Sequence, residues 1–549
     1  MVRRDQLVHG WREPVATRPA ATLILLRDTS AGIAVLMTRR SAQASFAPGV
    51  YVFPGGTLDA ADSSEAARHL LQTRPDQDAA EQHHAAAALR ETFEELGILL
   101  AHEQASGRAV DPARVSTLQR DPDTAFYAQL EAAGLRLAVD QTAWFSHWIT
   151  DRDLPRRFDV RFLVAPMPAG QIACADEQEQ FEPTWIAPAE ALARHEAGRF
   201  DLIFPTLRTL RQLARFASTA EVLAFCRAQS SVYTSCPRGG FLAGREVRYT
   251  EDEAPFGELE FVAPDGQVVH ALDWQSDRIV SLRHNIRRLT APNPGRMTGP
   301  GTNTYLVGNA LHCVVIDPGP AIDAHIDRLA EAVHESLSAI ICTHSHADHS
   351  PGAALLQARV GRDVPILGRP SGPHARPTAW FRPDRTLEDG ECIEAGDALL
   401  RVVCTPGHAA NHLCLVLEAD RVLFSGDHVL NGSTTVVDPP DGDMLAYLAS
   451  LDRLTREPVD FILPAHGYVL APAVPAMQAL ARHRLAREEK VLTALRAAGP
   501  SALESLVPHA YADVPVTLHG VAARSLLAHL LKLQAEGRAK QTGESWHLA

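Results

Sequence analysis

The chain has 549 residues and a formal net charge of −14 with histidine neutral. At roughly 100–200 residues per domain it is too long for a single core, so we expect three or more folded units. Hydrophobic residues make up 46% and charged residues 21%, which is typical of water-soluble globular proteins. The acidic balance argues against a chain that covers a polyanion along its whole length.

The first 14 residues are polar and lack the apolar core of a secretion signal. No stretch approaches the roughly 20 consecutive apolar residues of a membrane span. None of the eight cysteines is in CxxC spacing, and several lie within apolar runs, which is typical of buried thiols in a reducing compartment. We therefore expect a cytoplasmic protein that does not bind a membrane, and the sequence leaves its oligomeric state open.

The pattern of the sequence divides it into four parts. Apolar strand-like runs alternate with amphipathic helices over residues 17–215, and a less regular connecting segment covers 216–280. Within that segment the turn residues at 264–266 predict a hairpin. Strand-then-loop units follow over 281–473, and residues 474–549 are mostly helical with a short terminal hairpin.

The clearest helix of the first part, Ala79–Leu96, carries the three glutamates Glu91, Glu94 and Glu95. Residues three and four apart share one face of a helix, so the three carboxylates lie side by side. Stacked like charges destabilise a helix unless a cation lies among them, and oxygen-only ligands favour Mg²⁺ or Mn²⁺. The alternative interpretation is an amphipathic helix with a solvated acidic face.

The residues Arg-Glu-Thr-Phe-Glu-Glu-Leu-Gly-Ile at 90–98 resemble the REUxEExGU part of the Nudix box, where U is aliphatic. The Gly-rich turn that begins at Phe53 resembles the opening of that box. Asp62 stands where the box has glutamate, and extra residues separate it from Arg90. This form is similar to the coenzyme A diphosphatase-like branch of the Nudix hydrolases.

The Nudix resemblance implies an α/β/α sandwich that hydrolyses a small-molecule diphosphate with Mg²⁺ or Mn²⁺ held by Glu91, Glu94 and Glu95. Glu94 would act in catalysis, and Arg90 would orient the carboxylates through charge-assisted hydrogen bonds. Because Asp62 departs from the motif, a Nudix fold that only binds a ligand or serves as a scaffold is kept as an alternative.

In the third part, four apolar runs each end in residues of the kind that bind metals. The runs cover residues 339–343, 399–405, 422–425 and 461–464. The residues that follow them are His344, His346, Asp348, His349, His408, Asp427 and His466. Buried strands that end in such side chains can bring them together at one edge of a sandwich. Seven ligands are too many for one tetrahedral ion, and they fit two ions that share a carboxylate.

The alternative is a set of scattered histidines, since the chain has 25. That explains one lone histidine, but not four His or Asp residues within six positions followed by three more after separate strands. Neutral imidazole and carboxylate suit zinc, although iron or manganese could replace it. The sequence therefore predicts a hydrolase with a two-metal site.

The His-x-His-x-Asp-His motif at 344–349 resembles that of the metallo-β-lactamase superfamily, and the later ligands match its remaining motifs. The resemblance implies an αββα sandwich with two zinc ions. The first zinc would be held by His344, His346 and His408. The second would be held by Asp348, His349 and His466. Asp427 would bridge the two ions, and Asp348 would also act in catalysis by orienting the nucleophilic water.

Further stretches resemble the beta-lactamase-like protein 2 family, whose mammalian member is a mitochondrial single-strand endoribonuclease. They cover residues 293–308, 424–430, 432–437 and 483–488. The resemblance implies a winged-helix-like domain over 474–549. Residues 478–549 hold nine Lys or Arg against six Asp or Glu, a balance of +3, which favours phosphate contact as much as it favours a solvated helical face.

These patterns together indicate a multidomain α/β and α+β hydrolase with two metal sites. The leading hypothesis for the second site is phosphodiester hydrolysis, with single-stranded RNA as one candidate substrate. The alternative is an ester or thioester hydrolase of the glyoxalase type, because the same metals activate water whatever the leaving group. A different class, an RNA-binding or ligand-sensing protein, is the remaining alternative.

Overall fold

The computed structural model describes residues 6, 8–44, 46–120, 125–361 and 363–549. The chain forms two compact units. Glu13–Pro237 is the N-terminal unit, and Arg238–Ala549 together with the described residues before Glu13 is the C-terminal unit. None of the helices in these ranges combines the length and the apolar character that a membrane span requires.

A mixed sheet forms the centre of the N-terminal unit, with the main strand order β10-β7-β8-β1-β2-β3. β4 pairs with β1, and β9 pairs with β2. β1 and β8 are parallel, whereas β1 and β2 form an antiparallel hairpin. The strands are β1 (Thr17–Thr29), β2 (Gly32–Arg40), β3 (Tyr51–Val52), β4 (Gly55–Thr57), β7 (Ala143–Ile149), β8 (Arg157–Pro166), β9 (Gln180–Ile186) and β10 (Tyr233–Ser235).

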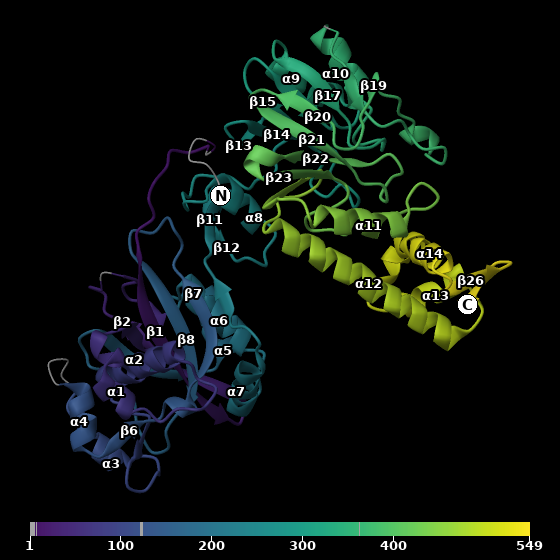
Figure 1. Ribbon diagram of the computed structural model, residues 1–549. Coiled ribbons are helices and arrows are strands. Elements are labelled where there is room, and N and C mark those ends of the chain that lie inside the picture. Colours follow the sequence, from purple (N-terminus) through teal and green to yellow (C-terminus); the bar gives the residue numbers. More distant parts are fainter. Residues whose placement is uncertain (1–5, 7, 45, 121–124, 362) are drawn as a thin grey trace. The chain divides into compact units, whose positions relative to one another are not determined.

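Helices cover both faces of this sheet (Figure 1). Side chains alternate along β1, so Leu23 and Leu25 pack with helix α2 on one face, while Ile24 and Leu26 pack with helices α5, α6 and α7 on the other. The helices are α2 (Ala79–Leu96), α5 (Pro188–Glu196), α6 (Phe204–Leu213) and α7 (Thr219–Ala228). The α/β/α sandwich expected from the sequence is therefore confirmed.

Helix α2 spans the predicted residues because both of its ends are capped locally. The Asp78 side chain accepts a hydrogen bond from the backbone N–H of Glu81, and Gly97 ends the helix in the left-handed conformation at φ 68°. The smaller elements of the unit are η2 (Ala60–Ser63), α1 (Glu65–His69), β5 (Ala101–Glu103), α3 (Pro112–Val115), α4 (Phe126–Ala132), β6 (Leu135–Leu137) and η3 (Val139–Gln141). Of these, η2 contains Asp62, and α1 lies within the extra residues between Asp62 and Arg90.

The segment 216–280 contributes to both units. α7 and β10 belong to the N-terminal unit, while β11 (Arg238–Leu242), β12 (Arg245–Tyr249) and α8 (Phe256–Val262) belong to the C-terminal unit. The hairpin expected at 264–266 is wrong, because the residues before that turn form helix α8. Phe261 and Val262 of α8 are buried in the core of the C-terminal unit, and this tertiary burial selects a helix there.

Two sheets stack face to face in the C-terminal unit. The seven-stranded sheet has its strands in chain order, β13 to β19, and the five-stranded sheet likewise runs from β20 to β24. The first contains β13 (Val280–Arg283), β14 (Ile286–Thr290), β15 (Asn303–Gly308), β16 (Cys313–Ile316), β17 (Leu337–Ile341), β18 (Ile366–Gly368) and β19 (Arg385–Thr386). The second contains β20 (Cys392–Ala395), β21 (Ala398–Cys404), β22 (Leu413–Leu417), β23 (Val422–Gly426) and β24 (Phe461–Pro464).

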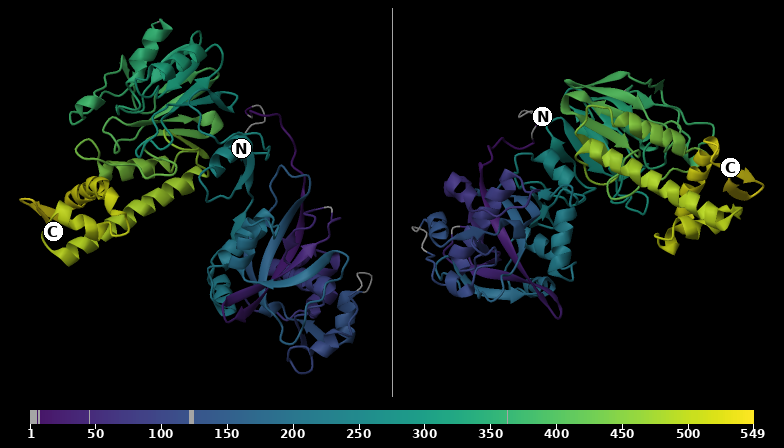
Figure 2. Two further views of the ribbon diagram at one scale, coloured as in Figure 1. Left: turned by 180° about the vertical axis from the view of Figure 1, so that it is seen from behind. Right: turned by 60° about the horizontal axis from the view of Figure 1, so that its bottom comes forward.

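The apolar core lies between these two sheets, where Tyr305 and Ile341 of the first sheet pack with Leu415 and Phe424 of the second. Helices α9 (Asp323–Val333) and α10 (Gly352–Val360) pack outside the first sheet, and α11 (Met444–Leu454) and α12 (Ala473–Ala498) pack outside the second (Figure 2). The turns η4 (Pro377–Ala379) and η5 (Glu418–Asp420) lie in loops of this sandwich. This arrangement confirms the expected αββα sandwich.

A small helical domain with its own core ends the chain. α12 extends into it, and Leu526 and Trp546 are among its buried side chains. The remaining elements are β25 (Ser501–Ala502), α13 (Leu503–Ala510), η6 (Val516–Leu518), α14 (His519–Ala535), β26 (Ala539–Thr542) and β27 (Ser545–Leu548). The three strands form one antiparallel sheet beside the helices, which is the winged-helix-like arrangement expected from the sequence.

A buried ion pair ties helix α8 to the sandwich. Arg288 donates two hydrogen bonds to the Glu258 carboxylate, at 2.6 and 2.9 Å, and His270 Nε2 lies 2.8 Å from the same group. Burial by itself would raise the pKa of Glu258, but Arg288 and His270 hold it at about 2. The carboxylate is therefore ionised, and its stability depends on its partners.

Arg288→Met should destabilise the C-terminal unit by about 3–5 kcal/mol, because it leaves the Glu258 charge buried without its main partner. The double variant Glu258→Gln/Arg288→Met should recover part of this loss, since it removes both charges. Urea unfolding measures the effect, with Arg382→Met at an exposed position as the control. Equal stability of Arg288→Met and the control would refute this account.

Candidate functional site

The seven predicted metal ligands follow strands β17, β21, β23 and β24. The last three run in one direction, because β22 is antiparallel to both β21 and β23, while β24 is parallel to β23. Their carboxyl ends therefore lie at one edge of the five-stranded sheet. β17 of the other sheet supplies the remaining ligands, and the structure brings all seven residues together in two groups.

The first group consists of His344, His346, His408 and Asp427, whose ligand atoms all lie within 4.8 Å of one another. The Nδ1 atom of His346 lies 3.0 Å from Nε2 of His344 and 2.9 Å from Nε2 of His408. Oδ2 of Asp427 lies 3.5 Å from Nε2 of His408.

The second group consists of Asp348, His349 and His466. Nε2 of His466 lies 3.3 Å from Oδ2 of Asp348, and Nε2 of His349 lies 3.4 Å from the same oxygen. Asp427 also faces this group, because its Oδ1 lies 3.3 Å from His466 and 3.5 Å from His349. Each oxygen of Asp427 thus faces a different group.

The hydrogen bonds around the first group fix how its rings are protonated. His408 donates from Nδ1 to a backbone carbonyl at 2.6 Å, so its Nε2 carries a lone pair. The Thr343 hydroxyl donates to Asp317 and therefore accepts from Nδ1 of His344, which leaves a lone pair on Nε2 of His344 as well. Both lone pairs point at His346, and a single proton on that ring cannot satisfy both.

The second group shows the same pattern. His349 donates from Nδ1 to Asp317 at 2.9 Å, and His466 donates from Nδ1 to a backbone carbonyl at 3.1 Å. Their Nε2 lone pairs consequently face the carboxylates of Asp348 and Asp427. Within the described part of the chain, Nε2 of His349 and Oδ1 of Asp427 are buried without a hydrogen-bond partner.

The histidine lone pairs and the carboxylates point at one another and repel unless a positive charge lies between them. Burial alone would lower the pKa of His466, yet Asp427 and Asp348 raise it to about 10. The site thus draws a cation to this position, and a metal ion serves as well as a proton. Imidazole and carboxylate are the donors that zinc and related divalent ions prefer, so the residues present fit two such ions.

Asp317 organises both groups and was missed by the sequence patterns. It accepts hydrogen bonds from the backbone and hydroxyl of Thr343, at 2.7 and 2.8 Å, and from His349. A carboxylate behind a ligating imidazole fixes its orientation and raises its basicity. The available signal was that the apolar strand Cys313–Ile316 also ends in an acidic residue.

Two further histidines lie behind the site. His412 Nδ1 lies 2.8 Å from the Thr405 hydroxyl, and its Nε2 accepts from the backbone N–H of Asp427. His428 is fully buried against Tyr447 with ring centroids 4.5 Å apart, and burial lowers its pKa to about 3. A neutral, enclosed ring of this kind packs and does not supply protons at neutral pH.

A cavity of about 330 Å³ opens onto the metal ligands. Its lining includes Asp348 and Asp427 as well as the three arginines Arg296, Arg376 and Arg524. Arg524 belongs to α14, so the terminal helical domain supplies part of the wall.

The loop 432–437, which follows β23, forms another wall of this cavity. The Val436 carbonyl accepts the hydrogen bond from the ligand His408, and Arg484 of α12 donates to the Thr435 carbonyl. Helix α12 thereby holds the loop that orients a metal ligand.

In the N-terminal unit, the Arg90 guanidinium connects three carboxylates. Nε and Nη2 donate to Asp62 at 2.9 and 3.1 Å, and Nη1 donates to Glu91 at 3.0 Å and to Glu94 at 2.9 Å. Asp62 is fully buried and also accepts from the Tyr127 hydroxyl at 2.7 Å. Asp62 therefore still anchors the arginine although it is shorter than glutamate.

Glu95 lies apart from these contacts, accepting from the backbone of Gly55 at 3.1 Å and from Gln180 at 2.8 Å. Among the described residues, the three glutamates of α2 do not form a group with all ligand atoms within 4.8 Å. Burial raises the pKa of Glu95 to about 8 and that of Glu91 to about 7, although Arg90 opposes the second shift. Carboxylates that are this reluctant to ionise fit a bound divalent cation.

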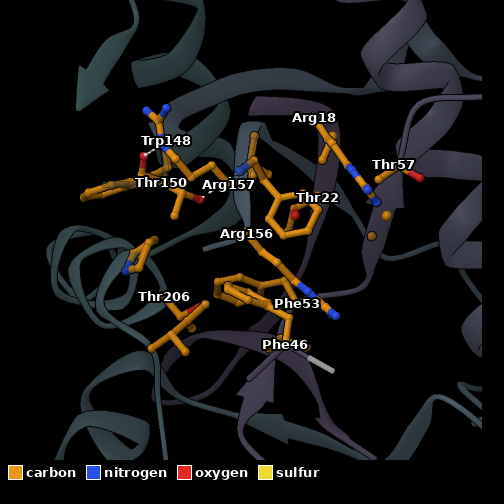
Figure 3. Close-up of a pocket in the computed structure, with 18 of the residues that line it drawn as sticks. Arg18, Thr22, Phe46, Phe53, Thr57, Trp148, Thr150, Arg156, Arg157 and Thr206 are labelled. Carbon is orange, nitrogen blue, oxygen red and sulfur yellow. Dashed lines mark hydrogen bonds between the residues drawn. The ribbon is translucent and has the colours of Figure 1, made fainter. Parts of the chain in front are cut away.

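A cavity of about 740 Å³ lies beside these residues and includes Glu91 in its lining. Figure 3 shows Phe46 and Phe53 together on one side of it and Arg18 beside Thr57 on another. Positive charge and aromatic surface thus meet next to the acidic helix.

Comparison with known proteins agrees with these two sites. Residues 297–466 match the model of the Metallo-beta-lactamase superfamily, and residues 502–546 match the Beta-lactamase associated winged helix domain. Residues 16–204 match the NUDIX domain. A lactamase-like protein (vrtG) of Penicillium aethiopicum is 34% identical over 40% of this chain and 68% of its own length. The chain belongs to the metallo-beta-lactamase superfamily.

Two other relatives of the metallo-beta-lactamase domain carry more specific names. The atrochrysone carboxyl ACP thioesterase of Aspergillus chevalieri is 35% identical over 38% of this chain, and the match spans 65% of that protein. The beta-lactamase-like protein 2 homolog of Caenorhabditis elegans is 28% identical over 47% of this chain and 87% of its own length. With the NUDIX match, these relatives support a hydrolase.

The winged-helix tail carries few uncommitted charges. Seven of its nine basic side chains are engaged within the fold by acidic groups or, for Arg484, by a backbone carbonyl. These are Arg484, Arg487, Lys490, Arg496, Arg524, Lys532 and Arg538. Arg482 and Lys540 are exposed. The balance of +3 already subtracts the acidic residues of the tail, and the contacts show that most of its basic groups lie beside an acidic partner.

Asp317→Ala should lower the metal affinity of the metallo-beta-lactamase domain by about 10–100-fold, because His349 and Thr343 lose the carboxylate that orients them. Metal analysis after dialysis against a weak chelator measures this loss without reference to activity. Asp323→Ala, which removes an exposed acid of α9, is the control. Unchanged metal content in Asp317→Ala would show that Asp317 does not support the site.

Proposed function

We propose that the metallo-beta-lactamase domain hydrolyses an ester or thioester bond in a small anionic substrate. The observation that carries this proposal is the cavity of about 330 Å³, which is lined both by predicted metal ligands and by arginines. Its volume is near the lower end of the range of small-molecule sites, so it suits a small molecule or the end of a longer one. The similarity to an ACP thioesterase supports the same reaction class.

In this proposal His344, His346 and His408 would hold one divalent ion, and Asp348, His349 and His466 would hold the other. Asp427, whose two oxygens face the two groups, would be shared between them. Two bound zinc ions would activate water and polarise the oxygen of the scissile carbonyl. Asp348, whose side chain is 27% exposed, lines the cavity and would accept a hydrogen bond from the attacking water.

The second candidate is phosphodiester hydrolysis with single-stranded RNA as substrate. The arginines of the cavity suit a phosphate, and the similarity to a beta-lactamase-like protein 2 homolog points the same way. Against it stands the internal pairing of most basic side chains in the tail, which leaves little positive surface for a polynucleotide.

His344→Ala should reduce hydrolysis of a short acyl thioester at least about hundredfold, because it removes a ligand of the first ion. The release of free thiol measures the reaction, and His312→Ala, at an exposed position, is the control. The same three proteins are assayed on single-stranded RNA. Cleavage of RNA without turnover of any thioester by the wild type would replace the first candidate by the second.

We propose further that the NUDIX domain hydrolyses a small-molecule diphosphate with Mg²⁺ or Mn²⁺ bound to the glutamates of α2. The cavity beside Glu91 supports this, because Arg18 and Arg40 suit a diphosphate, and Phe46 offers an aromatic surface to an organic group. Nε of Arg40 is buried without a hydrogen-bond partner among the described residues, which leaves a donor for the substrate.

Glu94→Gln should abolish hydrolysis of coenzyme A or ADP-ribose in the presence of Mg²⁺, since the neutral amide loses the charge that binds the cation. Phosphomonoester products are measured by chromatography, with Glu131→Gln, at an exposed position of α4, as the control. If the wild type cleaves no diphosphate from such a panel, the domain binds a ligand or serves as a scaffold instead.

A further inference from the structure

Three arginines from separate segments line the cavity of the metallo-beta-lactamase domain. Arg296 follows β14, Arg376 precedes η4, and Arg524 lies on α14 of the winged-helix domain. They occur together only because the terminal domain packs beside the sandwich, where Ala528 of α14 is buried in the same apolar cluster as Met477 and Tyr447.

One carboxylate serves two of these arginines. Asp438 accepts hydrogen bonds from both Arg376 and Arg524, and both bonds end on the same oxygen, Oδ2. Arg296 approaches only the backbone carbonyl of Thr517, at 3.5 Å. Apart from the predicted metal ligands, the cavity is therefore lined by these three guanidinium groups and by two carboxylates, Asp438 and Asp441, so the guanidinium groups outnumber the carboxylates by one.

Arg524 also has an unused donor. Its Nε is buried and has no hydrogen-bond partner within the described residues, although burying a polar group without a partner costs stability. A guanidinium presents its donors as a fork that matches the two oxygens of a carboxylate or phosphate. Because Arg524 lines the cavity and its side chain is partly exposed, its guanidinium can contact an anionic ligand there.

We propose that Arg524 is a specificity-determining residue that binds an anionic group of the substrate, together with Arg376 and Arg296. The substrate class is then an ester or thioester that carries a phosphate or a carboxylate away from the scissile bond. The inference rests on the proposed ester or thioester hydrolysis. It makes the winged-helix domain part of the substrate site.

The rival explanation is that Arg524 only fastens the winged-helix domain to the sandwich through Asp438. The two explanations differ in what Asp438 does. If Arg524 only fastens the domain, losing Arg524 and losing Asp438 should have the same effect. If Arg524 binds an anion, its removal lowers the affinity for the anion, whereas neutralising Asp438 frees donors that can bind it.

The test uses three probe thioesters, one neutral and two that carry negative charge on opposite sides of the scissile bond. S-acetylpantetheine is neutral, its 4′-phosphate carries the charge on the thiol side, and S-succinylpantetheine carries it on the acyl side. The preference for each charged probe is the ratio of its kcat/KM to that of the neutral probe. It is measured for the metal-loaded full chain and for the variants Arg524→Gln and Asp438→Asn.

We expect Arg524→Gln to lower the preference for at least one charged probe about tenfold, mainly through KM, because a charge-assisted hydrogen bond is lost. The probe that responds identifies the side of the substrate that carries the charge. Asp438→Asn should keep or raise the same preference. The exposed tail variant Arg482→Gln is the matched control and should behave as the wild type.

An unchanged preference in Arg524→Gln overturns the proposal, as does a fall of the preference in Asp438→Asn. If Arg524→Gln does not fold, as judged by circular dichroism and gel filtration, the result for Asp438→Asn alone decides in the same way. If the wild type turns over none of the three probes, the proposed reaction fails. Binding of 4′-phosphopantetheine against pantetheine, compared between wild type and Arg524→Gln by calorimetry, then tests the anion site by itself.

Discussion

Four imidazole lone pairs and two carboxylates converge at one edge of the sandwich, and this convergence constrains everything around it. Each ring keeps its orientation because its other nitrogen is held, by Thr343, Asp317 or a backbone carbonyl. Such an arrangement is unfavourable unless cations lie among the groups. Packing of the two-sheet core offsets this unfavourable free energy, and its rigid strands fix the positions from which the predicted ligands project.

The terminal domain is coupled to this site in two ways. Helix α12 uses Arg484 to hold the loop whose Val436 carbonyl orients His408. Helix α14 brings Arg524 to the wall of the cavity. The winged-helix fold thus supports the loop beside His408 and forms part of the cavity wall, and most of its basic side chains contact partners within the fold.

The NUDIX domain also places several acidic side chains close together, but it stabilises them with different partners. Glu91 and Glu94 lie on helix α2, where Arg90 donates hydrogen bonds to both of them and to Asp62. Glu95 is instead held by Gly55 and Gln180 on neighbouring strands. One chain therefore carries a site of imidazoles suited to zinc-like ions and a site of oxygens suited to Mg²⁺, which fits two hydrolytic activities with different substrates.

The sequence by itself determined the features that depend on local patterns. Helix α2 follows from its period and its caps, and the grouping of the seven predicted ligands follows from apolar strands that end in His or Asp. Only the tertiary structure decided the rest. Asp317 reaches His349 because β16 pairs with β17, and Arg524 reaches the cavity because α14 packs beside the sandwich.

Two further features also depend on tertiary contacts that local sequence patterns do not reveal: the pairing of the charges in the tail and the formation of helix α8. The balance of +3 is a correct count, but ion pairs such as Arg487 with Asp513 join residues 26 positions apart. The turn at 264–266 predicted a hairpin, yet burial of Phe261 in the core selects a helix before it. The local sequence determines which types of side chain are present. Contacts between distant segments determine which of these side chains meet. The reason is that the free energy of burial and of charge pairing is gained only where the folded chain brings the groups together.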